Sequence, residues 1–213
     1  MEIADISSFI DYTLLKADAD MRMFEKLCAE AAARNFYSVC VPPCVIKECK
    51  DFLKKSKVKI TTVAGFPLGF GTSAAKAAEI KDALERGADE VDAVMNVCAF
   101  KSGNTAYVGS EFARFRKASE GKVLKIIIET CFLAPQEIAL ASRLAAENGA
   151  DFVKTSTGYG TGGAKITDVE IIKSSVPENV RIKASGGIKA YAQAFEFIKA
   201  GASRIGSSSL LDK

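Results

Sequence analysis

The chain has 213 residues, 48% of them hydrophobic and 26% charged, and its 29 basic and 26 acidic side chains leave a net charge of +3. This length suits one well-buried domain, so we expect a single domain that spans residues 1–213. The scattered basic residues argue against nucleic-acid binding, and no apolar run or leader pattern predicts membrane insertion or export, so we expect a cytoplasmic protein with no membrane contact.

Strand-like and helix-like segments alternate along the whole chain. Helix starts are indicated by Asp20 as an N-cap, by Pro135 in a first turn, and by a capping-box pattern at 167–170. The predicted strands are 9–13, 37–41, 59–64, 90–95, 124–129, 152–156, 180–185 and 203–206. The predicted helices are 20–33, 45–55, 73–86, 107–119, 135–148, one from 167, 190–200, and a final turn after the eighth strand.

This alternation predicts a fold. An uninterrupted succession of strands and helices implies parallel strands with right-handed crossovers. Eight such units predict a closed (β/α)8 barrel, also called a TIM barrel. An open doubly wound sheet is the alternative, but no Gly-x-Gly-x-x-Gly motif follows an early strand, as a dinucleotide-binding sheet would require.

The absence of one residue type restricts the chemistry. The chain contains no histidine, which excludes Ser–His and Cys–His nucleophilic pairs and two-His zinc sites. Six cysteines are present, and no two of them form a Cys-x-x-Cys pair. Three of these cysteines cluster with irregular spacing at 40, 44 and 49, so reduced structural thiols are favoured over a thiolate metal site. We therefore expect no metal and no cofactor.

Two lysines lie within apolar strand-like runs. Lys154 belongs to the run Asp-Phe-Val-Lys-Thr-Ser-Thr-Gly at 151–158, and Lys183 to Arg-Ile-Lys-Ala-Ser-Gly-Gly-Ile at 181–188. Alternation along barrel strands directs both lysines and Asp92 into the barrel interior. Burial and a second cation lower the pKa of a lysine, which yields the neutral amine that Schiff-base chemistry needs. The alternative is structural, with lysines that reach water or form a buried salt bridge.

Other residues are expected to support this site. Lys125 and Glu129 share one parity on the predicted fifth strand, which indicates a supporting ion pair. The glycine-rich ends of strands seven and eight, at 185–188 and 206–209, are typical of backbone phosphate sites in barrels, with Lys189 as a charge partner. The alternative is that these glycines only make turns. The segment 61–69 predicts a strand and a tight turn over the barrel mouth.

These motifs carry a family resemblance. The runs Phe-Val-Lys-Thr-Ser-Thr-Gly at 152–158 and Lys-Ala-Ser-Gly-Gly-Ile at 183–188 are similar to those of deoxyribose-phosphate aldolases. The chain resembles that family along nearly its whole length, and further matches lie at 10–15, 62–69, 87–92, 127–130, 149–151 and 204–206. Tyr12 stands where many members carry histidine, and Tyr159 where some carry lysine. We also expect a chain without the C-terminal tail and terminal tyrosine that some members carry.

The resemblance implies a metal-free class I aldolase, a lyase on a (β/α)8 barrel. It would cleave 2-deoxy-D-ribose 5-phosphate reversibly to D-glyceraldehyde 3-phosphate and acetaldehyde in deoxynucleotide catabolism. Its partners would be these small molecules and copies of itself in a homodimer or homotetramer. Another Schiff-base aldolase or a transaldolase-like enzyme is the alternative, and so is a non-catalytic phosphate-binding barrel.

The resemblance also implies roles for particular residues. Lys154 would form the Schiff base, Lys183 would lower its pKa and join proton transfer, and Asp92 would act with a water in acid–base steps. The residues expected to bind substrate, including the phosphate group, are Asp11, Thr13, Cys40, Thr157, Gly158, Gly186, Gly187, Gly206, Ser208 and Ser209.

Overall fold

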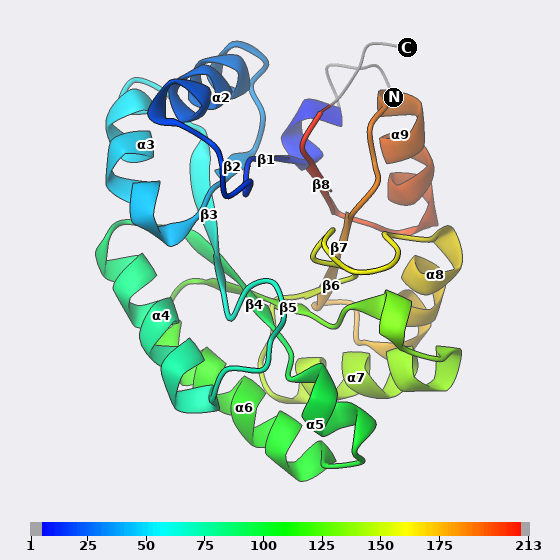
Figure 1. Cartoon of the computed structure of the whole chain (residues 1–213). Coiled ribbons are helices and arrows are strands. Elements are labelled where there is room, and N and C mark those ends of the chain that lie inside the picture. Colours follow the sequence, from blue (N-terminus) through cyan, green and yellow to red (C-terminus); the bar gives the residue numbers. More distant parts are fainter. Residues whose placement is uncertain (1–5, 210–213) are drawn as a thin grey trace.

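The computed structural model describes residues 6–209 and contains a closed barrel of eight parallel strands. Figure 1 shows the strands at the centre, with the helices arranged around them; apart from the short α5, which lies beside α6, they follow chain order. The eighth strand pairs with the first, with Ile10 opposite Ile205, which confirms the predicted TIM barrel and contradicts an open sheet. The strands are β1 Ile10–Thr13, β2 Ser38–Cys40, β3 Lys59–Ala64, β4 Glu90–Val94, β5 Val123–Ile127, β6 Phe152–Lys154, β7 Arg181–Ser185 and β8 Arg204–Ser207.

The helices follow the predicted order with one addition. A short helix, α5, follows β4 and is not predicted by the sequence, because five residues are too few to show a helical period. The predicted turn after the eighth strand lies outside the described residues. The α-helices are α2 Met21–Ala33, α3 Ile46–Phe52, α4 Ser73–Glu85, α5 Val97–Lys101, α6 Thr105–Ala118, α7 Pro135–Glu147, α8 Ile166–Ser175 and α9 Tyr191–Ala200, and the short 3-10 turns are η1 Ser7–Phe9, η2 Pro43–Val45 and η3 Thr130–Phe132.

Two of the three predicted helix starts are confirmed. The Asp20 side chain accepts a hydrogen bond from the N–H of Met23 at 3.0 Å, and α7 begins at Pro135. The predicted capping box at 167–170 is wrong, because α8 begins at Ile166 and its N-cap, Lys165, makes no side-chain cap. Residue 167 therefore lies inside the first turn, where its hydroxyl cannot act as the N-cap.

The two faces of the strands differ in chemistry. Val91 and Ala93 of β4, Val153 of β6, and Ile182 and Ala184 of β7 belong to the hydrophobic core between barrel and helices. The intervening residues point into the barrel, so the predicted parity of these strands is confirmed. Among the described residues, none of the helices is long and apolar enough to cross a membrane.

Candidate active site

Asp92, Lys154 and Lys183 meet inside the barrel. The Nζ atoms of Lys154 and Lys183 each donate a hydrogen bond to the same atom, Asp92 Oδ2, at 2.8 Å. The two lysines occupy paired positions on β6 and β7, so they face the same side of the sheet. The Lys154 side chain is only 4% exposed, and the other two are fully buried, so these lysines do not reach out to water. The predicted convergence of the three side chains is confirmed.

A network of buried charges continues from Asp92 toward the N-terminal ends of the strands. Asp92 Oδ1 accepts from Lys125 Nζ at 2.8 Å, and Lys125 Nζ lies 2.6 Å from Glu90 Oε2. The Arg204 guanidinium connects Glu90 Oε2, at 3.0 Å, to Asp11 Oδ1, at 2.9 Å. Apart from Lys154, this network holds three carboxylates and three cations, which balance in charge. We call these six the floor network: Asp11, Glu90, Asp92, Lys125, Lys183 and Arg204.

The predicted ion pair between Lys125 and Glu129 is wrong. β5 ends at Ile127, and Glu129 adopts a left-handed backbone conformation with φ of 55°, so strand parity does not extend to it. The Glu129 carboxylate instead accepts hydrogen bonds from the Thr157 hydroxyl and from the Thr157 N–H, the latter at 3.2 Å. Lys125 is thus part of the floor network, in direct contact with Asp92.

The environment pushes the two lysines toward different protonation states. Burial is the largest influence on Lys154 and lowers its pKa; the Asp92 carboxylate opposes this shift, and the Lys183 charge reinforces it. Burial also lowers the pKa of Lys183, but the Asp11 and Asp92 carboxylates together outweigh burial and raise it above its ordinary value. A pair of titratable groups with pKa values pushed apart in this way is typical of acid–base sites.

The Asp92 carboxyl group is held in its ionised form. Burial alone raises its pKa, but the charges of Lys125, Lys154 and Lys183 outweigh burial and hold the pKa well below its usual range. An anion at this position accepts hydrogen bonds from all three ammonium or amine groups. It is thereby suited to orient the Lys154 amine and to bind a water.

The structure places the other predicted pocket residues at different depths. Asp11 is fully buried, and its carboxylate contacts Lys183, Arg204 and the Ser38 hydroxyl. The Thr13 hydroxyl donates to the Asp11 carbonyl at 2.9 Å. Cys40 is fully buried opposite Thr13, and burial raises the pKa of its thiol. Asp11 therefore belongs to the floor network, whereas Thr13 and Cys40 lie nearer the ends of their strands.

The glycine-rich loops after β6, β7 and β8 lie side by side. The Ala164 N–H donates to the Gly186 carbonyl at 3.1 Å, and a Cβ on Gly158 would lie 3.7 Å from Gly186 Cα. Gly206 pairs with Ser185 across β7 and β8, and it has no room for a side chain beside Ser185 Cβ and Lys183 Cε.

Two of the predicted phosphate residues, Gly187 and Ser208, are open to solvent. Gly187 is exposed and has φ of 79°, and a Cβ added there meets no protein atom within 4 Å. Ser208 is exposed, and Ser209 is half-buried with its N–H directed at the Ser207 hydroxyl at 3.3 Å. The loops therefore meet where predicted and leave backbone groups accessible on one side of the barrel mouth.

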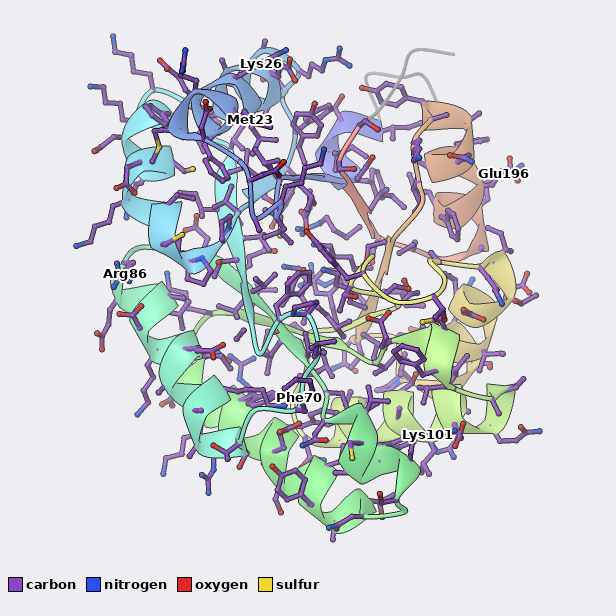
Figure 2. The ribbon with its side chains drawn as sticks, in the orientation of Figure 1. Met23, Lys26, Phe70, Arg86, Lys101 and Glu196 are labelled. Atoms are coloured by element: carbon purple, nitrogen blue, oxygen red, sulfur yellow. The ribbon has the colours of Figure 1, made fainter. Side chains whose placement is uncertain are left out.

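A cavity of about 120 Å3 opens on the other side of the mouth. Its walls are mostly apolar, and Glu129 with Thr157 provides its main polar surface. Tyr159 lines it, with its hydroxyl donating to the Leu15 carbonyl at 2.8 Å and its ring against Phe66 at 5.3 Å between centroids. Phe70, on the same loop as Phe66, is exposed and labelled in Figure 2. The lining residues are Pro67, Leu68, Val94, Val97, Glu129, Phe132, Thr157, Tyr159 and Gly160.

Sequence reasoning missed two members of the floor network, Glu90 and Arg204. A signal for each was present, because Glu90 shares strand parity with Asp92, and Arg204 shares parity with Gly206. Within residues 6–209, no cluster of three or more His, Cys, Asp or Glu side chains is arranged to hold a metal ion.

Comparisons with known proteins agree with this geometry. A model of the DeoC/LacD family aldolases matches residues 8–213. A deoxyribose-phosphate aldolase from Streptococcus pneumoniae strain P1031 is 48% identical over 203 residues, which cover 95% of this chain and 92% of the relative. The tetrameric structure of deoxyribose phosphate aldolase from Aeropyrum pernix has a TM-score of 0.89 at 34% identity, over 97% of this chain and 88% of that one. An aldolase designated QR15 has a TM-score of 0.93 at 38% identity, over 96% and 92% of the two chains.

Proposed function

Since the chain belongs to the DeoC/LacD family of aldolases, we propose that it cleaves 2-deoxy-D-ribose 5-phosphate reversibly to D-glyceraldehyde 3-phosphate and acetaldehyde. One observation carries the assignment of the site. Two buried lysines share a single carboxylate oxygen, and their surroundings lower the pKa of Lys154 while raising that of Lys183. Such an arrangement provides a nucleophilic amine beside a permanent cation.

The reaction begins at Lys154. Its neutral Nζ attacks the C1 carbonyl carbon of the open-chain sugar. The oxygen takes one proton from Nζ and a second from a neighbouring acid, and it leaves as water to give a protonated iminium ion. A base then removes the proton from the C3 hydroxyl, the C2–C3 bond breaks, and its electron pair forms the enamine of acetaldehyde on Lys154. Glyceraldehyde 3-phosphate leaves with the new carbonyl at the former C3. Protonation of the enamine carbon and hydrolysis release acetaldehyde and restore the amine.

The neighbouring side chains divide the remaining work. Lys183 keeps its positive charge, disfavours a charge on Lys154, and supplies a proton donor beside the reacting nitrogen. Asp92 stays anionic, so it orients both amines and binds the water that carries protons to and from the intermediates. Thr13 and Cys40, together with Thr157 and Gly158, border the sugar chain. Asp11 belongs to the floor network and holds the Lys183 side chain in place through their ion pair.

The phosphate binds at the loops after β7 and β8. Backbone N–H groups in glycine-rich turns bind anions well, and barrels commonly place phosphate at this corner. The proposed donors are the N–H groups of Gly186, Gly187 and Ser208, with Gly206 leaving room for the anion and the Ser208 and Ser209 hydroxyls assisting. A phosphate held here aligns the sugar across the mouth toward Lys154.

Borohydride trapping followed by peptide mapping tests this function. Reduction in the presence of deoxyribose 5-phosphate or acetaldehyde should add the expected mass to the peptide that contains Lys154. Labelling of Lys183 with Lys154 unmodified would reverse the assignment. Binding of the sugar phosphate without any trapped adduct would indicate a non-catalytic barrel.

The alternative activities are another Schiff-base aldolase and a transaldolase-like enzyme. They differ from the proposed enzyme in the donor substrate that they use. The proposed enzyme should use acetaldehyde as the donor aldehyde with glyceraldehyde 3-phosphate. Efficient use of dihydroxyacetone or its phosphate in place of acetaldehyde would contradict the assignment.

Membership of this family also supports a proposal for the compartment, the pathway and the assembly of the enzyme. We propose a cytoplasmic enzyme of deoxynucleotide catabolism that works as a homodimer or homotetramer. The tetramer of the Aeropyrum pernix relative supports an assembly of this kind. Light scattering on the purified chain tests it, and a monomeric mass at micromolar concentration would contradict it.

A further inference from the structure

A second buried ion pair lies outside the barrel, between helices α4 and α6. Lys76 Nζ is 2.7 Å from Glu111 Oε1, and neither side chain has any exposed surface. Burial lowers the pKa of Lys76 and raises that of Glu111, so this location disfavours an unpaired charge on either residue. Since a buried ion pair can often be replaced by apolar residues without loss of stability, stability alone explains this pair poorly.

Lys76 ties two separate segments together. Besides its ion pair with Glu111, Lys76 Nζ donates hydrogen bonds to two backbone carbonyls, that of Gly69 at 2.7 Å and that of Val94 at 3.0 Å. Gly69 closes the loop that follows β3, and Val94 is the last residue of β4. One buried side chain therefore holds the end of a loop against the end of a neighbouring strand.

Two glycines allow the loop to lie directly on this lysine. Gly65 and Gly69 have φ of 64° and 72°, a left-handed conformation that favours glycine. A Cβ on Gly65 would overlap Lys76 Cδ, and a Cβ on Gly69 would overlap the Met95 carbonyl oxygen. The loop is closed on itself by the Gly69 N–H, which donates to the Gly65 carbonyl at 2.8 Å. The contact with Lys76 thus depends on bare backbone at both positions.

Glu111 connects the ion pair to the start of the next helix, α5. Its Oε2 accepts from the N–H of Asn96 at 2.9 Å. The Asn96 side chain in turn accepts from the N–H of Ala99 at 2.9 Å and caps α5, which begins at Val97. The ion pair therefore fixes the segment between the end of β4 and the first turn of α5.

The two tied segments form neighbouring walls of the cavity at the barrel mouth. Pro67 and Leu68 line it from the loop, and Val94 and Val97 line it from the strand end and helix. Val94 is the next inward-facing residue of β4 after Asp92, so one strand carries both a cavity wall and the shared carboxylate. We propose that Lys76 and Glu111 are positioning residues that fix the position of these two walls and thereby the fit of the substrate beside Lys154. This proposal rests on the aldolase function proposed above.

The test replaces the pair by apolar residues of similar size, in the double variant Lys76→Met/Glu111→Leu. We expect KM for deoxyribose 5-phosphate to rise by at least about tenfold, with kcat falling by less than about threefold, because binding geometry is lost while the chemistry is intact. Saturating acetaldehyde with borohydride should still label Lys154. Hydrogen exchange should accelerate in peptides covering 65–71 and 94–101 and stay unchanged in the barrel strands.

A matched control removes an ion pair at the other end of the barrel. Arg116 contacts Asp151 at 2.8 Å near the N-terminal ends of β5 and β6. The variant Arg116→Met/Asp151→Ala should lower the melting temperature and leave KM and the exchange of the two mouth peptides unchanged. A rise in KM of equal size in this control would show that general destabilisation is responsible, and would overturn the proposal.

A second variant decides the question if the double variant does not fold. Gly65→Ala displaces the loop from Lys76 and keeps both charges, and Gly121→Ala introduces the same left-handed strain where an added Cβ meets nothing within 4 Å. We expect the KM rise and faster exchange for Gly65→Ala only. Parent-like KM and exchange in a folded Gly65→Ala variant would overturn the positioning role. Absence of aldolase activity in the parent protein would contradict the proposed function. In that case the hydrogen-exchange data would still test whether Lys76 and Glu111 hold the two segments in place.

Discussion

At the scale of single residues, Lys183 acts on Lys154 through its charge. The variant Lys183→Leu removes a cation that lowers the Lys154 pKa and leaves Asp92 less neutralised, and both changes raise that pKa. At neutral pH less neutral amine remains, so the rate should fall by at least about a hundredfold and recover in part as the pH rises. The pH profile of Schiff-base formation measures the shift. The exposed Lys199→Leu substitution is the control, and an unshifted profile for Lys183→Leu would disprove the two-lysine argument.

The floor network predicts two shifts of opposite sign. Lys125→Met removes a positive charge beside Asp92, so the pH profile for Schiff-base formation should move to higher pH. Glu90→Gln removes a negative charge, so the profile should move to lower pH. The double variant restores the charge balance and should return the midpoint toward that of the parent. Shifts in the same direction for both single variants would show that disturbed packing, not charge, is responsible.

Sequence alternation predicted the convergence of Asp92, Lys154 and Lys183, because parity on a regular strand is fixed by geometry. The partners Glu90 and Arg204 were not predicted, since their contact depends on how the barrel closes between β8 and β1. The prediction of a Lys125–Glu129 ion pair is wrong for a local reason. The chain leaves the strand after Ile127, and parity carries no information beyond that point.

At the scale of elements, the loop after β7 offers a test of the phosphate site. Gly187 is exposed with a left-handed backbone that Asn and Asp tolerate better than other side chains. Gly187→Asp and Gly187→Asn are nearly equal in size and differ by one negative charge. If the anion binds at this loop, KM for deoxyribose 5-phosphate should be at least about tenfold higher for the Asp variant than for the Asn variant.

Unphosphorylated deoxyribose provides the comparison for these two variants. Both should handle it equally, because the added charge lies away from Lys154. Equal KM values of the two variants on the phosphorylated sugar would place the anion elsewhere on the molecule.

Element order and most element ends were predictable from periodicity and turn residues. The exceptions have physical causes. α5 is too short to show a period, and its start is fixed by its N-cap, Asn96, and by Glu111, which is distant in the sequence. α8 begins at Ile166, because a capping-box pattern describes one favourable start and does not exclude an earlier one. The meeting of the glycine-rich loops was predictable, since parallel strands end on one face of a barrel.

At the scale of the whole molecule, the buried carboxylates make the free energy of unfolding depend on pH in the acid range. The pKa of Asp11 and that of Asp92 are lowered from an ordinary value of 3.8, and that of Glu90 from 4.5, because the facing cations outweigh burial. A lowered folded-state pKa stabilises the fold above the unfolded value, and this contribution is lost as the pH falls through the folded value. The free energy of unfolding should therefore be steady near neutrality and fall steadily below about pH 4.

Urea unfolding between pH 2.5 and 7 measures this dependence. The surface pair Lys199 and Glu196 provides a control, since Glu196→Gln should leave the slope below pH 4 nearly unchanged. Stability that is constant down to pH 2.5 would mean that folding does not lower the pKa values of these carboxyl groups.

The barrel itself was the most predictable feature, because eight alternating units of this length leave few parallel topologies. The cavity was not predictable. Its walls come from loops after β3, β4, β5 and β6, and their position depends on buried contacts such as Lys76 with two backbone carbonyls.

Once Lys154 becomes a protonated iminium ion, its nitrogen carries a positive charge. The six surrounding charges already cancel, so nothing in the floor network compensates this cation. An uncompensated cation in a region closed to solvent draws electrons more strongly. Breakage of the C2–C3 bond delivers an electron pair to that nitrogen and returns the interior to neutrality. The same balance that keeps the free amine uncharged thus favours the step in which carbon–carbon bonding electrons move toward it.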